Sequence, residues 1–412
     1  MNLPRGDAAP GSGSPVPRGG GRLAVRCIVV DPQHTLAPGE VVWDAGGRIV
    51  QLRRARRAQA DLCLLPGLVD AHVHLQLEPL RGRTPPRAFV PWVEAVMAAQ
   101  RGALPLQLRQ RARRAASMLL RDGAVAFGEI DGSGQSLAAL RATPASGRSY
   151  RELTGFHLGA EASRALVRER RLAAAGAFAT GLSPHAPYSV SPELFAAARA
   201  ASRYLTVHCA ETAEEQEFLR RGRGPFRDLL QQLGRLPDGF RAPGIGAVRW
   251  LERLGVLAPT TLLVHCQELE RGDVARIAGA GAPVVVCPGT IDWFDRTPPP
   301  VPRWLRAGIP VALGTDSRAS NDAWSMRHEL RRAAALWPDL APSELLAMAT
   351  TAGGRALRLP GLGRLRRGGR ADFVAVRGSE PRRVVEDFVH GRVRPAFVVA
   401  GGVRVPAARL RR

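Results

Sequence analysis

The chain has 412 residues, enough for one large α/β barrel or for roughly two to three domains of average size. Its formal charge is +23, and all 59 basic residues are arginine. These arginines are spread along the chain and are not interleaved with aromatic residues that could stack on bases, which favours a solvated surface over a specific nucleic-acid site. The five cysteines form no CxxC pair, which argues against a disulfide scaffold and a thiolate zinc site. No apolar run reaches about 18 residues, which argues against a membrane span.

The two ends of the chain are predicted to be rich in β-strands. The first 21 residues are rich in proline and glycine and lack the apolar core of a signal peptide, so a disordered tail is expected there. Residues 23–31 and 40–52 then have the short, β-branched pattern of strands, with Gly46 and Gly47 supplying a hairpin turn. Residues 371–377 and 396–406 repeat this pattern near the other end.

Between these ends, apolar runs of strand length alternate with amphipathic helical stretches, which is typical of repeated β/α units around a parallel sheet. Eight such runs are present, the number that a closed barrel needs. They are residues 63–74, 123–130, 150–156, 178–185, 204–211, 261–266, 282–288 and 310–316. Helices are predicted at 105–120, 192–202, 274–279 and 341–352, and residues 222–246 form an insertion whose shape the pattern does not indicate.

Polar residues able to bind a metal follow the apolar strands at one end. His72 and His74 are two residues apart, so both side chains point to the same side of the first strand. The same placement recurs at other strand ends, in His185, His208, His265 and Asp316. A single histidine at a strand end is more often a hydrogen-bonded structural residue, but burying the whole set without a shared charge would cost several kcal/mol.

Three imidazoles and one carboxylate suit one divalent ion, with zinc expected first and ferrous iron as the alternative, and leave a position for water. Glu211, three residues after His208, is the natural proton carrier, although a carboxylate at a helix N-terminus is the structural alternative. His265 is then placed to stabilise charge on the attacking oxygen, and Asp316 to share a ligand role with orientation of the nucleophile.

Five motifs occur in this chain in the order PGLVDAHVH, SPHAPYS, VHCAETAEE, VHC and LGTDSRASN. In these motifs the chain resembles the amidohydrolase superfamily, specifically the cytosine-deaminase-like and chlorohydrolase-like branch of that superfamily. The resemblance implies a (β/α)8 TIM barrel over residues 64–358, with residues 22–63 and 359–412 forming a small β-sandwich. Because the chain has no lysine, a carbamylated lysine bridging two metals is chemically impossible, so only a site for one metal ion remains.

The resemblance also implies a role for each residue of the strand-end set. The implied metal ligands are His72, His74, His208 and Asp316. Glu211 resembles the proton shuttle, His265 the residue beside the attacking water, His185 a histidine that contacts substrate, and Ser320 a position that touches the base. Gln76 and Trp92 lie at positions that resemble the substrate side of the site, where relatives carry acidic residues that this chain lacks.

Within that branch, residues 86–100, 210–230 and 311–331 look most like the aminodeoxyfutalosine deaminases of menaquinone biosynthesis, which act on an adenine nucleoside carrying a carboxyphenyl group. The expected activity is therefore hydrolytic deamination of an aminated heterocycle, a small-molecule substrate, by an enzyme of the cytoplasm. The alternatives are a chlorohydrolase or cyclic-amide hydrolase, a deaminase of S-adenosylhomocysteine, methylthioadenosine or guanine, and a non-catalytic binding barrel. The oligomeric state is left open, with a homodimer as one arrangement.

Overall fold

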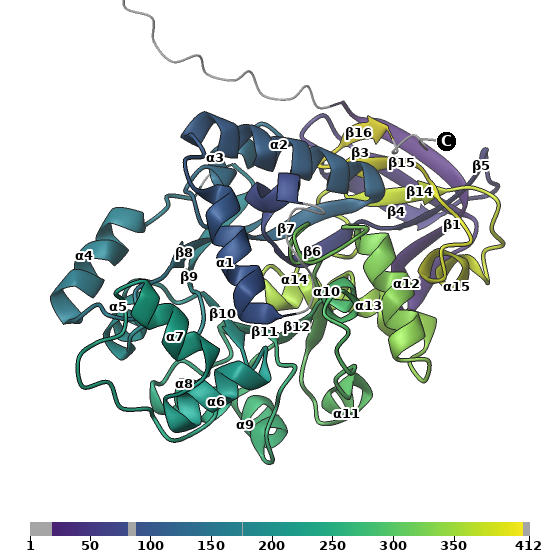
Figure 1. Cartoon of the computed structure of the whole chain (residues 1–412). Helices are drawn as coiled ribbons and strands as arrows, with labels where there is room; N and C mark the ends of the chain where they lie inside the picture. Colours follow the sequence, from purple (N-terminus) through teal and green to yellow (C-terminus); the bar gives the residue numbers. More distant parts are fainter. Residues whose placement is uncertain (1–18, 81–87, 175, 407–412) are drawn as a thin grey trace, which may run out of the picture.

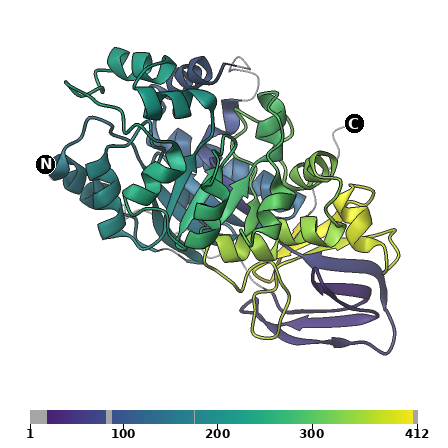
Figure 2. The same ribbon diagram turned by 90° about the horizontal axis from the view of Figure 1, so that it is seen from below.

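The computed structural model describes residues 19–80, 88–174 and 176–406, in which a parallel barrel lies beside a separate mixed sheet (Figures 1 and 2). Of the tail predicted over residues 1–21, positions 1–18 lie outside the described residues, and Gly21 already begins the first strand. No helix within the described ranges is both long and apolar enough to cross a membrane.

Eight parallel strands form the barrel sheet, which confirms the number and order of the predicted strands. The strands are fully buried or nearly so, as expected where an outer ring of helices covers a parallel sheet. In chain order they are β6 (Leu68–Val73), β7 (Ala124–Asp131), β8 (Ser146–Leu153), β9 (Phe178–Pro184), β10 (Leu205–Cys209), β11 (Thr261–His265), β12 (Val284–Val286) and β13 (Val311–Leu313).

The barrel closes between its first and last strands through the backbone of three strand-end residues. The His74 N–H donates to the Asp316 carbonyl oxygen at 2.9 Å, and the Asp316 N–H donates to the His72 carbonyl oxygen at 3.0 Å. The seam that completes the barrel is therefore built from residues that the sequence marks as functional.

The helices alternate with the strands and surround them (Figure 1). They are α1 (Phe89–Gln100), α2 (Pro105–Asp122), α3 (Ser136–Leu140), α4 (Ala160–Arg170), α5 (Pro192–Ala201), α6 (Ala213–Arg221), α7 (Pro225–Gln232), α8 (Ala247–Arg253), α9 (Asp273–Ala280), α10 (Pro288–Trp293), α11 (Val301–Arg306), α12 (Met326–Leu336), α13 (Pro342–Met348), α14 (Thr351–Ala356) and α15 (Val384–Val389), with a 3-10 helix η1 (Leu75–Leu80). The helix predicted over 341–352 is two helices, α13 and α14, and the insertion at 222–246 contains α7.

The run predicted as the first barrel strand, residues 63–74, is in fact divided between two sheets. Its first part belongs to β5 (Ala60–Pro66), which pairs with strands of the mixed sheet, and only the part from Leu68 enters the barrel as β6. Gly67 separates the two because a Cβ there would collide with the side chain of Val125. The chain therefore passes from one sheet to the other at Gly67, and β8 begins at Ser146, four residues before its predicted start.

Both ends of the chain contribute to the second sheet, whose purple and yellow strands lie side by side in Figure 2. Its strand order is β16-β15-β14-β5-β1-β3-β4, with β2 paired to β1. The strands are β1 (Gly21–Asp31), β2 (His34–Leu36), β3 (Gly39–Trp43), β4 (Ile49–Arg54), β5, β14 (Phe373–Val376), β15 (Pro395–Ala400) and β16 (Val403–Pro406). One face packs on the barrel, and the other encloses its own core, which includes Ile28, Leu64 and Phe373.

Candidate metal centre and active site

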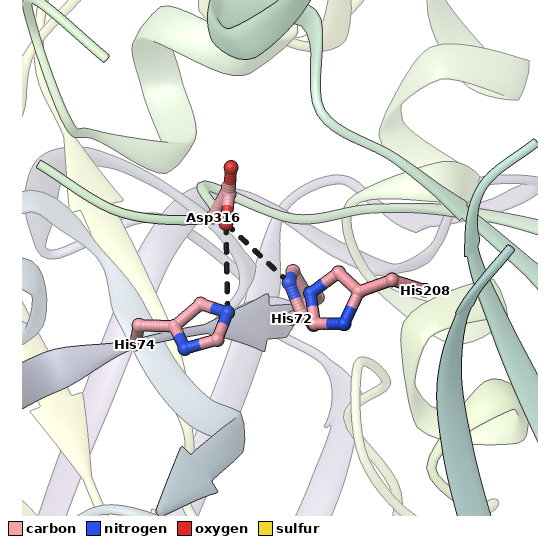
Figure 3. Close-up of side chains that lie close together, drawn as sticks. All are labelled: His72, His74, His208 and Asp316. Atoms are coloured by element: carbon pink, nitrogen blue, oxygen red, sulfur yellow. Dashed lines mark ion pairs between the residues drawn. The ribbon is translucent and has the colours of Figure 1, made fainter. Parts of the chain in front are cut away.

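Four side chains converge at the carboxyl end of the barrel strands. They come from the ends of β6 and β10 and from the residues that follow β13. Each offers one ligand atom, and these four atoms lie within 4.8 Å of one another; the residues are His72, His74, His208 and Asp316. Figure 3 shows the Asp316 carboxylate facing His72 and His74. One Asp316 oxygen is 3.5 Å from His72 Nε2 and 3.6 Å from His74 Nε2.

The chemistry of this set fits a divalent cation. His72 is fully buried, and neither of its ring nitrogens has a hydrogen-bond partner among the described residues, which is costly for a polar group unless something else binds it. Burial lowers the pKa of both His72 and His74 to about 3, so both rings are neutral with a free lone pair at neutral pH. Burial alone would raise the pKa of Asp316, but the adjacent imidazoles hold it well below its usual range.

Hydrogen bonds around the set fix its orientation. The Nδ1–H of His208 donates to the carbonyl oxygen of His185 at 3.0 Å, which leaves Nε2 of His208 as the nitrogen that can bind an ion. The second carboxylate oxygen of Asp316 accepts two hydrogen bonds, one from the Thr290 hydroxyl at 2.9 Å and one from the Ser320 hydroxyl at 2.7 Å. One Asp316 oxygen is thus fixed by two hydroxyls while the other faces the histidines.

Ser320, predicted to touch the base, lies fully buried behind Asp316. Its hydroxyl donates to the Asp316 carboxylate and so orients it, and Ser320 is not among the described residues that line the cavity in front of the histidines. The cavity wall carries Ser317 instead, three residues earlier in the same loop.

Glu211 lies beside this cluster and faces His265. The Glu211 carboxylate is 3.7 Å from Nε2 of His265, and both side chains are about 5% exposed. Burial raises the pKa of Glu211 to about 6, and burial lowers the pKa of His265 to about 3. A carboxyl group with a pKa near neutrality can both accept and donate a proton under physiological conditions.

Glu211 stands at the N-terminal end of helix α6, the place that its structural alternative requires, but it is not the residue that caps the helix. Helix α6 begins at Ala213 with Thr212 as its N-cap, whose hydroxyl accepts from the Glu215 N–H at 3.1 Å. Glu211 precedes this cap, and its own N–H donates to the Glu215 carboxylate at 2.8 Å. The cap therefore leaves the Glu211 side chain free to face the cavity.

A cavity of about 360 Å³ opens in front of the cluster. Its inner end carries the polar side chains of His74, His185, His208, Glu211, His265 and Asp316. Both residues predicted on the substrate side, Gln76 and Trp92, also line it. The Trp92 indole N–H donates to the Ala319 carbonyl oxygen at 3.0 Å, and Gln76 Oε1 accepts from the Ser133 N–H, so both side chains are held in place.

Two residues of the site were missed by sequence reasoning. Glu152 lies on β8 and lines the cavity, and its carboxylate has no ion-pair partner among the described residues. Arg296, from the segment between α10 and α11, lies 3.5 Å from the Glu211 carboxylate and packs over the rings of Phe89 and Phe294. Of these two residues, only Glu152 could have been found from the sequence. It stands near the end of a barrel strand, as the other polar residues of the site do.

Comparison with models of protein families matches residues 63–403 to the amidohydrolase family. The chain belongs to the amidohydrolase family. This confirms the resemblance in the motifs, and with the four converging ligand atoms it makes His72, His74, His208 and Asp316 a metal-binding site.

A curated relative supports the family assignment, and two solved structures share the fold. The aminodeoxyfutalosine deaminase of Deinococcus radiodurans is 34% identical over 379 residues, which are 83% of this chain and 83% of that protein. The aminofutalosine deaminase of Helicobacter pylori in complex with methylthio-coformycin has a TM-score of 0.79 at 21% identity, covering 93% of this chain and 99% of that chain. An adenosine deaminase from Xanthomonas campestris with bound zinc has a TM-score of 0.76 at 22% identity, covering 94% and 92%. The two solved structures show the shared fold.

Proposed function

We propose that this member of the amidohydrolase family is a metal-dependent hydrolytic deaminase of adenine nucleosides, with aminodeoxyfutalosine as its substrate. One observation carries the proposal: the ligand set and the facing pair of Glu211 and His265 lie at the same inner end of one cavity. The similarity to the Deinococcus enzyme, which extends over 83% of both chains, supports the choice of nucleoside. This activity would place the enzyme in menaquinone biosynthesis in the cytoplasm.

Zinc is the metal we propose, held by His72, His74, His208 and Asp316. Three imidazole nitrogens and one carboxylate oxygen are a donor set that suits zinc in an open catalytic site, and the zinc-bound adenosine deaminase of the same fold supports this choice. When bound, the ion supplies a Lewis acid that lowers the pKa of water towards about 7.

Glu211 is the proposed proton carrier. In its ionised form it accepts a proton from the attacking water, and it then delivers that proton to the purine ring nitrogen beside the carbon under attack. Its pKa of about 6 suits both steps at neutral pH. His265 stays neutral at this pH, and its ring, 3.7 Å from Glu211, is placed to hydrogen bond to the attacking oxygen as charge develops there.

The substrate side of the cavity fits a hydroxylated ring compound. The ring of His185 is held by a hydrogen bond of 2.8 Å between its Nδ1 and the Ser189 hydroxyl, so it offers one face to a bound base. Glu152 and Gln76 line the cavity nearby, and the carboxylate of Glu152 can accept hydrogen bonds from ribose hydroxyls.

Ammonia release tests this function. The zinc-loaded protein should release ammonia from aminodeoxyfutalosine, and less efficiently from adenosine and methylthioadenosine, with guanine, cytosine and a chlorinated s-triazine as comparison substrates. Ammonia from guanine or cytosine alone, or chloride from the triazine without any nucleoside turnover, would replace the proposed activity with another chemistry of the same family.

A further inference from the structure

The outer half of the active-site cavity is lined by two helices that present apolar side chains. Helix α1 contributes Trp92, Val96 and Met97, and helix α7, from the insertion at 222–246, contributes Phe226 and Leu229. At 1.5 Å per residue, the lining residues from Phe226 in α7 to Leu233, which directly follows this helix, extend over about 10 Å. This part of the cavity is therefore walled mainly by apolar side chains.

The inner ends of these helices lie close to the metal ligands. The ring of Phe226 stacks on Tyr188 with centroids 3.8 Å apart, and Tyr188 in turn contacts the ring of His185 at 5.7 Å. The His185 ring lies 4.7 Å from that of His208. Phe226 thus marks the end of α7 nearest the metal ligands. The chain beyond Leu233 lines the part of the cavity at the opposite end of this helix.

Arg235 lines that part and is the one guanidinium among the described residues that line the cavity. The carboxylates on the wall, which belong to Glu152, Glu211 and Asp316, come from the barrel strands or from the residues that follow them. Within the described ranges, the side chain of Arg235 makes no hydrogen bond or ion pair, whereas Arg223 on the same segment pairs with Glu217. A half-buried cation on a cavity wall without an anionic partner is available to a ligand.

The backbone fixes Arg235 in this position. Helix α7 ends in a turn where the Arg235 N–H donates to the Leu230 carbonyl oxygen at 2.8 Å and the Gly234 N–H to that of Gln231 at 3.0 Å. Gly234 has φ of 63°, a left-handed conformation that glycine adopts without strain. Leu236, the next residue, packs against the core. The turn therefore places the guanidinium at the cavity wall reproducibly.

We propose that Arg235 binds an anionic group at the end of an apolar substituent of the substrate, and that it selects nucleosides whose 5′ arm is apolar and ends in a carboxylate. The inference rests on the proposed function. A guanidinium binds a carboxylate through two parallel hydrogen bonds, while the walls of α1 and α7 bury the apolar part of the arm. A phosphate attached directly to the ribose is also an anion, but it would not extend along the apolar walls.

Binding to a variant that cannot turn over its substrate tests this proposal. In the zinc-loaded Glu211→Gln protein, the Kd of aminodeoxyfutalosine, which carries a carboxyphenyl group, is compared with those of methylthioadenosine, whose arm is neutral, and AMP, whose anion lacks an apolar arm. Adding Arg235→Gln should raise the Kd of aminodeoxyfutalosine about 10-fold and change that of methylthioadenosine less than about 2-fold, as expected for one partly exposed charged hydrogen-bonding pair.

The matched control is Arg241→Gln, which removes an exposed arginine from the same segment that lines a different groove. It should leave all three Kd values unchanged. An equal effect of Arg235→Gln on aminodeoxyfutalosine and methylthioadenosine would overturn the proposal, and so would AMP binding that is as tight and as dependent on Arg235. If the Glu211→Gln protein binds none of the nucleosides, the proposed function falls and this inference with it; binding that ignores Arg235 overturns the inference alone.

Discussion

The ion pair between Arg296 and Glu211 should set the pH at which the enzyme loses activity on the acid side. Arg296 lies 3.5 Å from the Glu211 carboxylate, and the two side chains are 14% and 5% exposed, so solvent screens their attraction little. Burial raises the pKa of Glu211 to about 6, and the positive charge of Arg296 opposes this rise by favouring the ionised form. Removing the charge in Arg296→Gln should therefore raise the pKa of Glu211 further.

An opposite charge at this separation shifts a pKa by about 1 to 3 units, so a rise of one to two units is expected in the variant. With a pKa of about 6, roughly nine-tenths of Glu211 is ionised at pH 7; with a pKa of about 7 to 8, the ionised fraction is about one-half to one-tenth. If ionised Glu211 is needed to accept the proton of water, kcat/KM at pH 7 should fall about 2- to 10-fold, and it should recover at pH 9.

The assay is a pH profile of kcat/KM for ammonia release from pH 5 to 9. The matched control is Arg332→Gln, which removes an arginine that pairs with Asp292 at the surface and should leave the profile in place. An acid limb of Arg296→Gln that coincides with that of the parent, or a fall in activity by the same factor at every pH, would show that Arg296 does not set the pKa of Glu211.

Three further substitutions test the assigned roles. Glu211→Gln should keep its metal while turnover falls by orders of magnitude, and equal turnover would remove Glu211 from the mechanism. Replacing His72 and His74 together by alanine should abolish metal binding and activity, and a stoichiometric metal content measured by elemental analysis would show that the ligand assignment is wrong. Ser320→Ala removes one of the two hydroxyls that fix Asp316, so a metal-competition titration should show an affinity loss of about 10-fold or more with folding retained; unchanged affinity would mean that Thr290 alone suffices.

The parts of the site that local sequence predicts are those that follow from strand geometry. His72 and His74 share one side of a strand by their spacing, and His208, His265 and Asp316 follow buried strands whose ends meet at one rim of the barrel. These positions could be found without knowing which helix packs where. The eight barrel strands were predictable for the same reason, since each is a short apolar run with turn residues around it.

The parts that were missed depend on contacts between distant segments. Arg296 follows Glu211 by 85 positions in the chain, and no local pattern connects the two residues. The wall formed by α7 could not be read from residues 222–246, because it faces the cavity opposite distant segments, as the stacking of Phe226 on Tyr188 shows. Ser320 follows the last strand closely, yet it turns behind Asp316, and its side-chain direction depends on the loop as a whole.

The run at 63–74 was predicted as one strand for a related reason. Its apolar residues continue without a break from β5 into β6, so composition gives no sign that the chain passes from one sheet to another. The sign is a single residue, Gly67, which is needed because its backbone passes close to Val125 of the neighbouring strand. Such a close approach becomes visible only in the folded structure.

Metal dependence can be measured by adding zinc back to protein stripped of metal while ammonia release from aminodeoxyfutalosine is followed. Without metal the protein should be inactive, and activity should rise linearly with added zinc and stop rising at one zinc per chain. Full activity in protein shown by elemental analysis to contain no metal, or a rise that continues to two ions per chain, would contradict this expectation.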